Sequence, residues 1–373
     1  MIDVKEFYNE LLKNNIDFFT GVPDSLLKEI CAYIALKTPK NKNIITSNEG
    51  GAISLATGYQ IATKKIPMIY MQNSGIGNAV NPLMSLADKE VYSIPMLLLI
   101  GWRGEPGTKD EPQHIKQGRI TQEMLNSMEI PVFILDQFSD YQKVIKNSVE
   151  NAVRLSCPVA ILVRKGSFSE FKIDSGKDRF NVSREEALEE IIKYIPQNSI
   201  IVSTTGMLSR ELFELREKYN QSHKTDFLTV GSMGHTSQIA LGMALAKPDK
   251  NVFCFDGDGS AIMHLGNYAI AGNIGLSNFK IILFNNGAHD SVGGQPTIGH
   301  NVDFNRIVEG LNFKSFGSIK DKNEIKKLIP EFIKNDSCSF VEIKIKKGAR
   351  KDLGRPTLSP IQNKELLISY ISE

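Results

Sequence analysis

The 373-residue chain has few cysteines, a single tryptophan and almost no net charge. Its four cysteines stand far apart along the sequence (Cys31, Cys157, Cys254, Cys338). Because no two of them are closely spaced, the pattern argues against a cysteine-based zinc site or a disulfide framework, and we expect reduced thiols. A formal net charge of +2 provides no strong positive field, so nucleic acid is not expected as a partner.

Long apolar runs are missing as well. No segment approaches the roughly 20 apolar residues that a membrane-spanning helix needs. The first seven residues lack the basic and then apolar layout of a secretory signal. With 41% hydrophobic and 23% charged residues, the composition is typical of a soluble globular protein. We therefore expect a cytoplasmic protein without a membrane partner, folded as one large domain or two medium ones.

Strand-like and helix-like segments alternate along most of the chain. Apolar runs of strand length end in polar or glycine-containing turns, and segments of helical periodicity follow them. The predicted strands are 43–47, 67–72, 96–100, 132–135, 159–163, 199–203, 251–255, 279–284 and 339–345, with a short strand within 17–24. The predicted helices are 4–14, 25–37, 51–63, 80–87, 141–154, 185–194, 209–219, 236–246 and 323–335. This alternation predicts right-handed crossovers and parallel sheets.

The alternation is interrupted once, by a polar stretch with several glycines. Residues 167–183 have this composition and are predicted to be a linker. Ser183, with Glu186 three positions later, forms a capping box that predicts a new helix. The order of strand, polar loop, helix and strand in 66–101 recurs in 251–285. We therefore predict an α/β fold with two similar domains, 1–166 and 184–373, each a parallel sheet flanked by helices, with a C-terminal tail at 348–373.

Two predicted strands of the second half end in polar turns that suit a metal ion and a phosphate. Asp258 follows the first strand, and Asn286 follows the next one. Carboxylate and amide oxygens are ligands that Mg²⁺ accepts, and the carbonyl of Ala288 could supply a third. Gly257 and Gly259 allow close approach, and the helix beginning near Ser260 presents free N–H groups to a phosphate. An Asp-Gly turn alone would be unremarkable, but the Asn pair on the next strand favours a metal site.

Glu49 stands between a predicted strand and a helix rich in small and apolar residues. A carboxyl group in that place would be largely desolvated, which raises its pKa and lets it share a proton with a heterocycle nitrogen. A carboxylate at a helix start, stabilised by the helix dipole, is the simpler interpretation from the residues alone.

These motifs together resemble a known family. Glu49 with Gly50-Gly51-Ala52, and Gly257-Asp258-Gly259 with Asn285-Asn286, are similar to the signatures of thiamine-diphosphate (ThDP) enzymes of the 2-oxoacid decarboxylase group. The resemblance covers nearly the whole chain, as a pyrimidine-binding domain followed by a diphosphate-binding domain without the usual middle domain. Segments 20–27, 101–107, 110–114 and 353–357 are most similar to the branch acting on phosphonopyruvate. The branch acting on sulfopyruvate, often split into two chains at the linker, is a near relative.

The resemblance implies ThDP and Mg²⁺ as cofactors and assigns roles to residues. Glu49 would hydrogen-bond the aminopyrimidine ring, and Asp258, Asn286 and the Ala288 carbonyl would hold Mg²⁺. Further cofactor contacts are expected from loops of the second half: Thr205, Gly206, Gly231, Ser232, Met233, Gly257, Gly259, Ser260 and His289. Met233 matches the bulky residue that bends the cofactor, although periodicity would equally allow a plain core methionine.

An anionic substrate calls for basic residues, and two loops supply candidates. Arg103 and Lys109 follow one strand of the first half, and Arg350, Lys351 and Arg355 lie in a segment, 348–360, that resembles a lid. Taken singly, each of these side chains is more simply a surface charge. Asp24 and Ser25 lie in the first strand-end loop, where relatives place polar groups next to the substrate. His114, His235 and His289 lie in loops near the expected site and could each transfer a proton; His114 is the first candidate because it shares a loop with Arg103.

The expected activity is that of a carbon–carbon lyase. The resemblance implies Mg²⁺- and ThDP-dependent decarboxylation of 3-phosphonopyruvate to phosphonoacetaldehyde and carbon dioxide, in phosphonate biosynthesis. Sulfopyruvate is the rival substrate.

Two competing hypotheses are a carboligase and a protein that binds ThDP without turnover. A Rossmann dehydrogenase is disfavoured because no Gly-x-Gly-x-x-Gly follows the first strand. Relatives also imply self-association, with the active site at a subunit interface.

Overall fold

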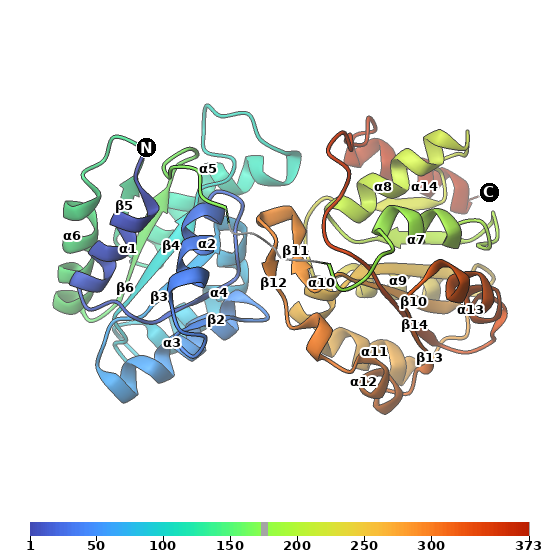
Figure 1. The fold of residues 1–373 in the computed structure, drawn as a ribbon, viewed down its shortest axis with the longest axis horizontal. Coiled ribbons are helices and arrows are strands. Elements are labelled where there is room, and N and C mark those ends of the chain that lie inside the picture. Colours follow the sequence, from blue (N-terminus) through green and yellow to red (C-terminus); the bar gives the residue numbers. More distant parts are fainter. Residues whose placement is uncertain (173–177, 373) are drawn as a thin grey trace. The chain divides into compact units, whose positions relative to one another are not determined.

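The computed structural model describes residues 1–172 and 178–372 of the chain (Figure 1). Residues 173–177, which belong to the predicted linker, lie outside this description. The chain forms two compact units, Met1–Ser175 and Gly176–Glu373. Each unit contains a six-stranded parallel sheet flanked by helices, so the predicted fold class is confirmed. The exact limits of the two domains stay a prediction.

The first unit is built on a sheet in the order β2-β1-β3-β4-β6-β5. Its strands are β1 (Phe19–Gly21), β2 (Asn43–Ile45), β3 (Met68–Gln72), β4 (Met96–Gly101), β5 (Val132–Leu135) and β6 (Pro158–Val163). Its helices are α1 (Val4–Lys13), α2 (Lys28–Lys37), α3 (Glu49–Thr63), α4 (Ile76–Pro82), α5 (Pro112–Ser127) and α6 (Tyr141–Leu155). A π-helical turn, Leu83–Ala87, continues α4.

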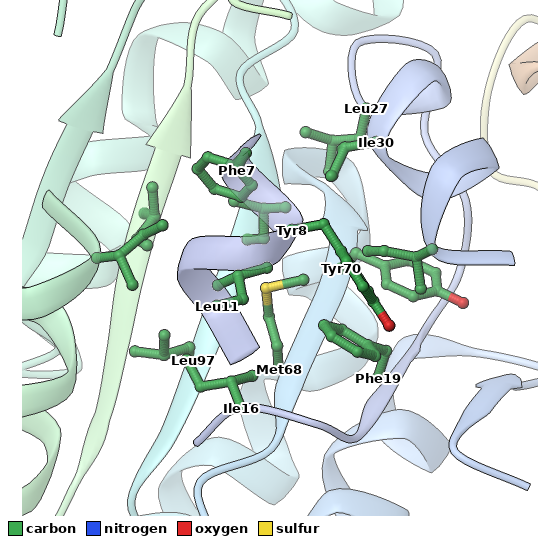
Figure 2. Packing of buried hydrophobic residues seen from close by; sticks show 14 of the residues in the cluster. Phe7, Tyr8, Leu11, Ile16, Phe19, Leu27, Ile30, Met68, Tyr70 and Leu97 are labelled. Carbon is green, nitrogen blue, oxygen red and sulfur yellow. The ribbon is translucent and has the colours of Figure 1, made fainter. Parts of the chain in front are cut away.

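Both faces of this sheet are buried, which explains why its strands are continuous apolar runs. Along β4, Leu97 belongs to one core cluster, whereas Leu98 belongs to the cluster on the opposite face. Figure 2 shows the first cluster, in which Phe7 and Leu11 of α1 pack near Met68 of β3.

The second unit has a sheet in the order β13-β14-β10-β9-β7-β8. Its strands are β7 (Ile200–Ser203), β8 (Asp226–Leu228), β9 (Val252–Gly257), β10 (Phe279–Asn285), β13 (Lys314–Ile319) and β14 (Ser339–Lys344). Its helices are α7 (Arg184–Ile191), α8 (Met207–Lys218), α9 (Thr236–Ala246), α10 (Asp258–Met263), α11 (Gly266–Ile274), α12 (Phe304–Gly310), α13 (Lys322–Lys334) and α14 (Pro360–Ser372). A small hairpin pairs β11 (Ala288–His289) with β12 (Gln295–Pro296). The predicted capping box of Ser183 and Glu186 is present at the start of α7.

The structure contains elements that the sequence patterns did not predict, among them α5, α12, α14, β8 and β13. The buried side of α5 consists of His114, Gly118, Thr121 and Leu125, so the helix lacks an apolar stripe. The expectation that His114 lies in a loop is therefore wrong, because the residue is in the first turn of α5. Helix α3 begins at Glu49, two residues earlier than predicted, which places this carboxyl in a helical first turn.

The C-terminal segment is held against the second unit. Asn363 of α14 donates to the Asp226 carbonyl and accepts from the Leu228 N–H, both on the edge strand β8. Arg210 of α8 donates to the carbonyls of Leu353 and Gly354. Across the described part of the chain, no helix combines the length and apolar character needed to cross a bilayer.

Candidate cofactor and substrate site

Three neighbouring strands of the second unit end in turns that carry most of the predicted cofactor residues. The sheet places β7, β9 and β10 side by side, and all three run in the same direction. Their carboxyl ends therefore meet at one edge of the sheet, which brings the turns after Ser203, Gly257 and Asn285 together. The chain passes from β7 outward to β8 and then returns to β9 on the other side of β7. Such a switch point is where open α/β sheets bind ligands.

Asp258 is the central acidic group of this edge. It is the first residue of α10 and is 2% exposed. Burial raises the pKa of its carboxyl group to about 6, against the opposing effect of hydrogen bonds from the Thr297 hydroxyl and the Asn286 N–H. A β-carbon on Gly299 would lie 2.4 Å from Asp258 Oδ2, so glycine is required at that position. A buried carboxylate of this kind is unfavourable unless a cation or proton compensates it.

The two asparagines at the carboxyl end of β10 each have their amide nitrogen held by a carboxylate. Asn285 Nδ2 donates to Glu342 Oε1 at 2.6 Å, and Asn286 Nδ2 donates to Asp290 Oδ2 at 2.6 Å. Asn286 Oδ1 accepts from the Ala288 N–H at 3.1 Å, which folds the turn that carries the Ala288 carbonyl.

The donor set fits Mg²⁺ accompanied by a phosphate ligand. Among the described residues, no group of three or more His, Cys, Asp or Glu side chains could hold a metal. One buried carboxylate with neutral oxygens from Asn286 and Ala288 instead suits a hard ion that keeps water and phosphate oxygens as ligands. The residues at this edge would therefore hold Mg²⁺ together with a diphosphate.

The turns around the metal residues are closely packed. Ser260 Oγ accepts from the Gly234 N–H at 3.0 Å and lies 3.2 Å from Thr204 Oγ1. Thr204, and not the predicted Thr205, thus has its hydroxyl in this network. Thr205 and Gly206 are partly exposed, and Gly206 has a φ of +100° where α8 begins.

Met233 and His289 approach each other across Gly259. A β-carbon on Gly259 would lie 3.2 Å from the His289 ring and 3.3 Å from the Met233 methyl group. Burial lowers the pKa of His289 to about 4, so its imidazole is neutral at pH 7. Ser232, which lies between Gly231 and Met233 in the loop before α9, adopts a left-handed conformation with a φ of +54°.

In the first unit, Glu49 is buried at the carboxyl end of β2. It is 5% exposed, and its Oε2 accepts from Asn78 Nδ2 of α4 at 2.7 Å. Burial raises the pKa of this carboxyl, and the Asn78 hydrogen bond opposes the rise. A β-carbon on Gly75 would lie 2.3 Å from Glu49 Oε1. Glu49 is therefore a desolvated acid, not a solvated helix-start carboxylate, and is suited to protonate or bind a heterocycle nitrogen.

The predicted substrate residues Asp24, Ser25 and Arg103 form one cluster at the ends of β1, β3 and β4. Asp24 is fully buried and accepts from Gln72 Nε2 at 2.7 Å. Burial raises the pKa of Asp24 against the hydrogen bonds from Gln72 and the Leu26 N–H. Arg103 Nη1 donates to Ser25 Oγ at 2.7 Å.

Arg103 already has an acidic partner. Its Nε and Nη2 atoms bind both oxygens of Asp110, at 2.8 and 2.5 Å. Lys109 in the same loop is exposed. His114 is buried, and its Nδ1 atom has no hydrogen-bond partner among the residues described. Burial, reinforced by the charge of Arg103, lowers the pKa of His114 to about 4.

The basic residues of the C-terminal segment belong to the second unit. Arg350 is paired there with Glu185, Glu214 and Asp352, so three carboxylates already compensate its charge. Lys351 and Arg355 are exposed.

Sequence reasoning missed the residues that hold the predicted ones in place. Asn78 binds Glu49, Thr297 binds Asp258, and Asp290 binds Asn286. Asp290 lies four positions after Asn286 in a polar turn, which is a weak signal. Nothing in the sequence distinguishes Asn78 or Thr297 from other polar loop residues.

Family models match both halves of the chain. A model described as thiamine pyrophosphate enzyme, N-terminal TPP binding domain, matches residues 3–130, and its C-terminal TPP binding counterpart matches residues 204–343. Thiamine pyrophosphate is another name for ThDP. The chain is 28% identical to phosphonopyruvate decarboxylase of Streptomyces viridochromogenes, over 97% of this chain and 93% of that protein.

Two further relatives carry a different substrate name. Sulfopyruvate decarboxylase of Methanosarcina acetivorans is 25% identical over 93% of this chain and 92% of its own length. Sulfopyruvate decarboxylase subunit alpha of Methanocaldococcus jannaschii is 36% identical over 42% of this chain and 89% of its own length.

Proposed function

We propose, from the premise that this chain belongs to the ThDP-dependent 2-oxoacid decarboxylases, that it converts 3-phosphonopyruvate to phosphonoacetaldehyde and carbon dioxide. The choice of substrate rests on the similarity to phosphonopyruvate decarboxylase over 97% of the chain. Such an activity would serve phosphonate biosynthesis.

The second unit is proposed to bind the diphosphate end of ThDP through Mg²⁺. Asp258 supplies a negative charge, and the Asn286 amide and Ala288 carbonyl supply neutral oxygens, which together suit Mg²⁺. Helix α10 begins at this edge, and its first N–H groups together with Ser260 are proposed to contact phosphate oxygens. When bound, ThDP supplies the nucleophilic carbon and accepts the electron pair that carbon dioxide leaves behind.

Glu49 is proposed to be the acid that binds the aminopyrimidine. Its burial favours the protonated carboxyl, which can exchange a proton with a ring nitrogen, while the hydrogen bond from Asn78 holds the carboxyl in place. Met233 and His289, on either side of Gly259, would limit the space beside the cofactor.

The cluster of the first unit is proposed to bind the substrate. Ser25 and Arg103 offer donors to an anionic group, and the exposed Lys109 adds a positive charge to the same loop. His114 is neutral at pH 7, and its unpartnered Nδ1, judged over the described residues, is available for a proton of the substrate or product. Lys351, Arg355 and Arg350 are further candidates for the phosphonate, and Arg350 would first have to leave its carboxylates.

A panel of 2-oxoacids tests this proposal. Purified protein with Mg²⁺ and ThDP is offered 3-phosphonopyruvate, sulfopyruvate, pyruvate and benzoylformate, and carbon dioxide release is measured with and without ThDP. We expect the highest kcat/KM for 3-phosphonopyruvate and no release without ThDP. A higher kcat/KM for sulfopyruvate would transfer the assignment to that acid, which two of the relatives make the second candidate.

The same assay tests Glu49. We expect Glu49→Gln to lose at least about 100-fold in kcat, the scale of general acid–base catalysis, while ThDP binding measured by calorimetry persists. Full activity in this variant would remove Glu49 from the mechanism.

A further inference from the structure

Asp290 connects three parts of the second unit through a single oxygen. Its Oδ2 atom accepts from Asn286 Nδ2 at 2.6 Å, from Arg184 Nη1 at 3.2 Å and from the Gly348 N–H at 3.0 Å. Asn286 belongs to the proposed metal turn, Arg184 begins α7, and Gly348 begins the C-terminal segment. No step of the proposed function uses this carboxylate.

The bond from Asn286 determines which end of its amide is available to a cation. An asparagine amide has one oxygen acceptor and one nitrogen donor, and the two ends are nearly identical in shape. With Nδ2 bound to a carboxylate, Oδ1 must lie on the other side, where it accepts from the Ala288 N–H. A rotated amide would bring its oxygen against the Asp290 carboxylate and turn donor hydrogens towards the metal site.

Arg184 holds the Asp290 carboxylate in turn. Arg184 is 6% exposed and binds both Glu211 oxygens, at 2.8 and 3.2 Å, as well as Asp290. A buried guanidinium between two carboxylates has little freedom to move, because losing either partner would leave charge uncompensated. The position of Asp290 is thus determined by the interior of the unit and not by solvent.

We propose that Asp290 is a positioning residue for Mg²⁺: it orients the Asn286 amide so that the oxygen faces the ion, and Arg184 holds Asp290 in place. This inference rests on the proposed Mg²⁺–ThDP site and is independent of which 2-oxoacid is the substrate. Partners of metal ligands in other proteins act in this way, and their loss typically weakens metal affinity about 10- to 100-fold.

The test compares two variants of Asp290 with one variant of its neighbour. Asp290→Ala removes the acceptor, and Asp290→Asn keeps an acceptor oxygen. Glu211→Gln disturbs the same buried arginine but leaves the contact between Asn286 and Asp290 intact. Mg²⁺ is titrated at fixed ThDP by calorimetry, and the Tm of each protein without cofactor is measured alongside.

We expect half-saturating Mg²⁺ to rise about 10- to 100-fold in Asp290→Ala and less in Asp290→Asn. At saturating Mg²⁺, kcat should recover most of its wild-type value. Glu211→Gln should lower the Tm without changing the Mg²⁺ requirement. Asp290→Ala could fail to fold. In that case, a raised Mg²⁺ requirement in Asp290→Asn but not in Glu211→Gln would still show that Asp290 positions the Asn286 amide for Mg²⁺.

Two results would overturn the inference. One is an unchanged Mg²⁺ requirement in the Asp290 variants, and the other is an equal rise in Glu211→Gln, which would make the effect merely structural. If the wild-type protein shows no Mg²⁺-dependent ThDP binding, the proposed function itself falls, and the inference falls with it.

Discussion

At the scale of single residues, glycines determine where the acidic groups lie. Gly101 would place a β-carbon 2.0 Å from Asp24 Oδ2, and Gly75 would place one 2.3 Å from Glu49 Oε1. Both acids are therefore packed against backbone that leaves no room for a side chain. Gly75 has φ and ψ values of −70° and −16°, which any residue can adopt. Glycine is therefore needed there for close approach and not for the backbone conformation.

Gly75→Ala should consequently move Glu49 while leaving the backbone conformation allowed. We expect about a 100-fold loss of kcat, because a displacement of about 1 Å in a catalytic group costs that much. The matched control is Gly77→Ala, two residues later in α4, where a β-carbon would meet nothing within 4 Å in the described chain apart from its chain neighbours and the backbone of its own helix. It should keep its activity and gain about 0.5–1 kcal/mol in unfolding free energy. Decarboxylation rates and urea unfolding check both variants, and equal rates for the two would contradict the argument.

At the scale of elements, α14 completes the edge of the second sheet. The side chain of Asn363 is 4% exposed and supplies both a donor and an acceptor to β8, as a neighbouring strand would. Leu367 from the next turn is buried in the core. The C-terminal end of the predicted tail is therefore part of the fold, which leaves only the segment before α14 as a candidate lid.

Asn363→Ala should leave the Leu228 N–H and the Asp226 carbonyl buried without their partner. Each unsatisfied group is costly, so we expect a loss of about 1–3 kcal/mol in unfolding free energy. Lys364→Ala, at the exposed neighbouring position, should change stability by less than about 0.5 kcal/mol. Urea denaturation of both proteins measures the difference, and an unaffected Asn363→Ala protein would show that α14 adds little to the stability of β8.

At the scale of the whole molecule, the proposed acid and the proposed metal residues belong to different compact units. Glu49 lies in the first unit, and Asp258 lies in the second. The resemblance to ThDP enzymes predicts that the two meet between subunits, with the first unit of one chain facing the second unit of another. A homodimer would then be the smallest active form.

Mixing two inactive variants tests that prediction. Glu49→Gln and Asp258→Asn are each expected to be inactive alone. If sites form between subunits, each hybrid dimer regains one intact site, and an equal mixture after subunit exchange should recover about a quarter of wild-type activity. If each site forms within one chain, the mixture stays inactive. Omitting the exchange step provides the control.

Much of the site could be predicted because its signals are local. Asp258 and Asn286 each directly follow an apolar strand. Their position at the carboxyl edge of the sheet can therefore be predicted from the alternation of strands and helices alone. The sequence pattern does not predict α5, because this helix buries polar residues and glycine, including His114, and these hide the helical period. The contact of Thr205 with the diphosphate stays a prediction, and no signal in the sequence pointed to the hydrogen bond of the neighbouring Thr204 to Ser260.

The sequence by itself determined the parallel α/β fold and the order of the motifs, because periodicity and turn chemistry act between near neighbours in the chain. It also indicated Asp258 and Asn286 at the strand ends, whereas Glu49 was indicated only by the resemblance to a family. Tertiary structure decided which groups hold them. Asn78 reaches Glu49 from 29 positions away, and Thr297 reaches Asp258 from 39 positions away. Such contacts depend on how strands order themselves in the sheet and on which glycines permit close packing, and no local pattern in the chain encodes either.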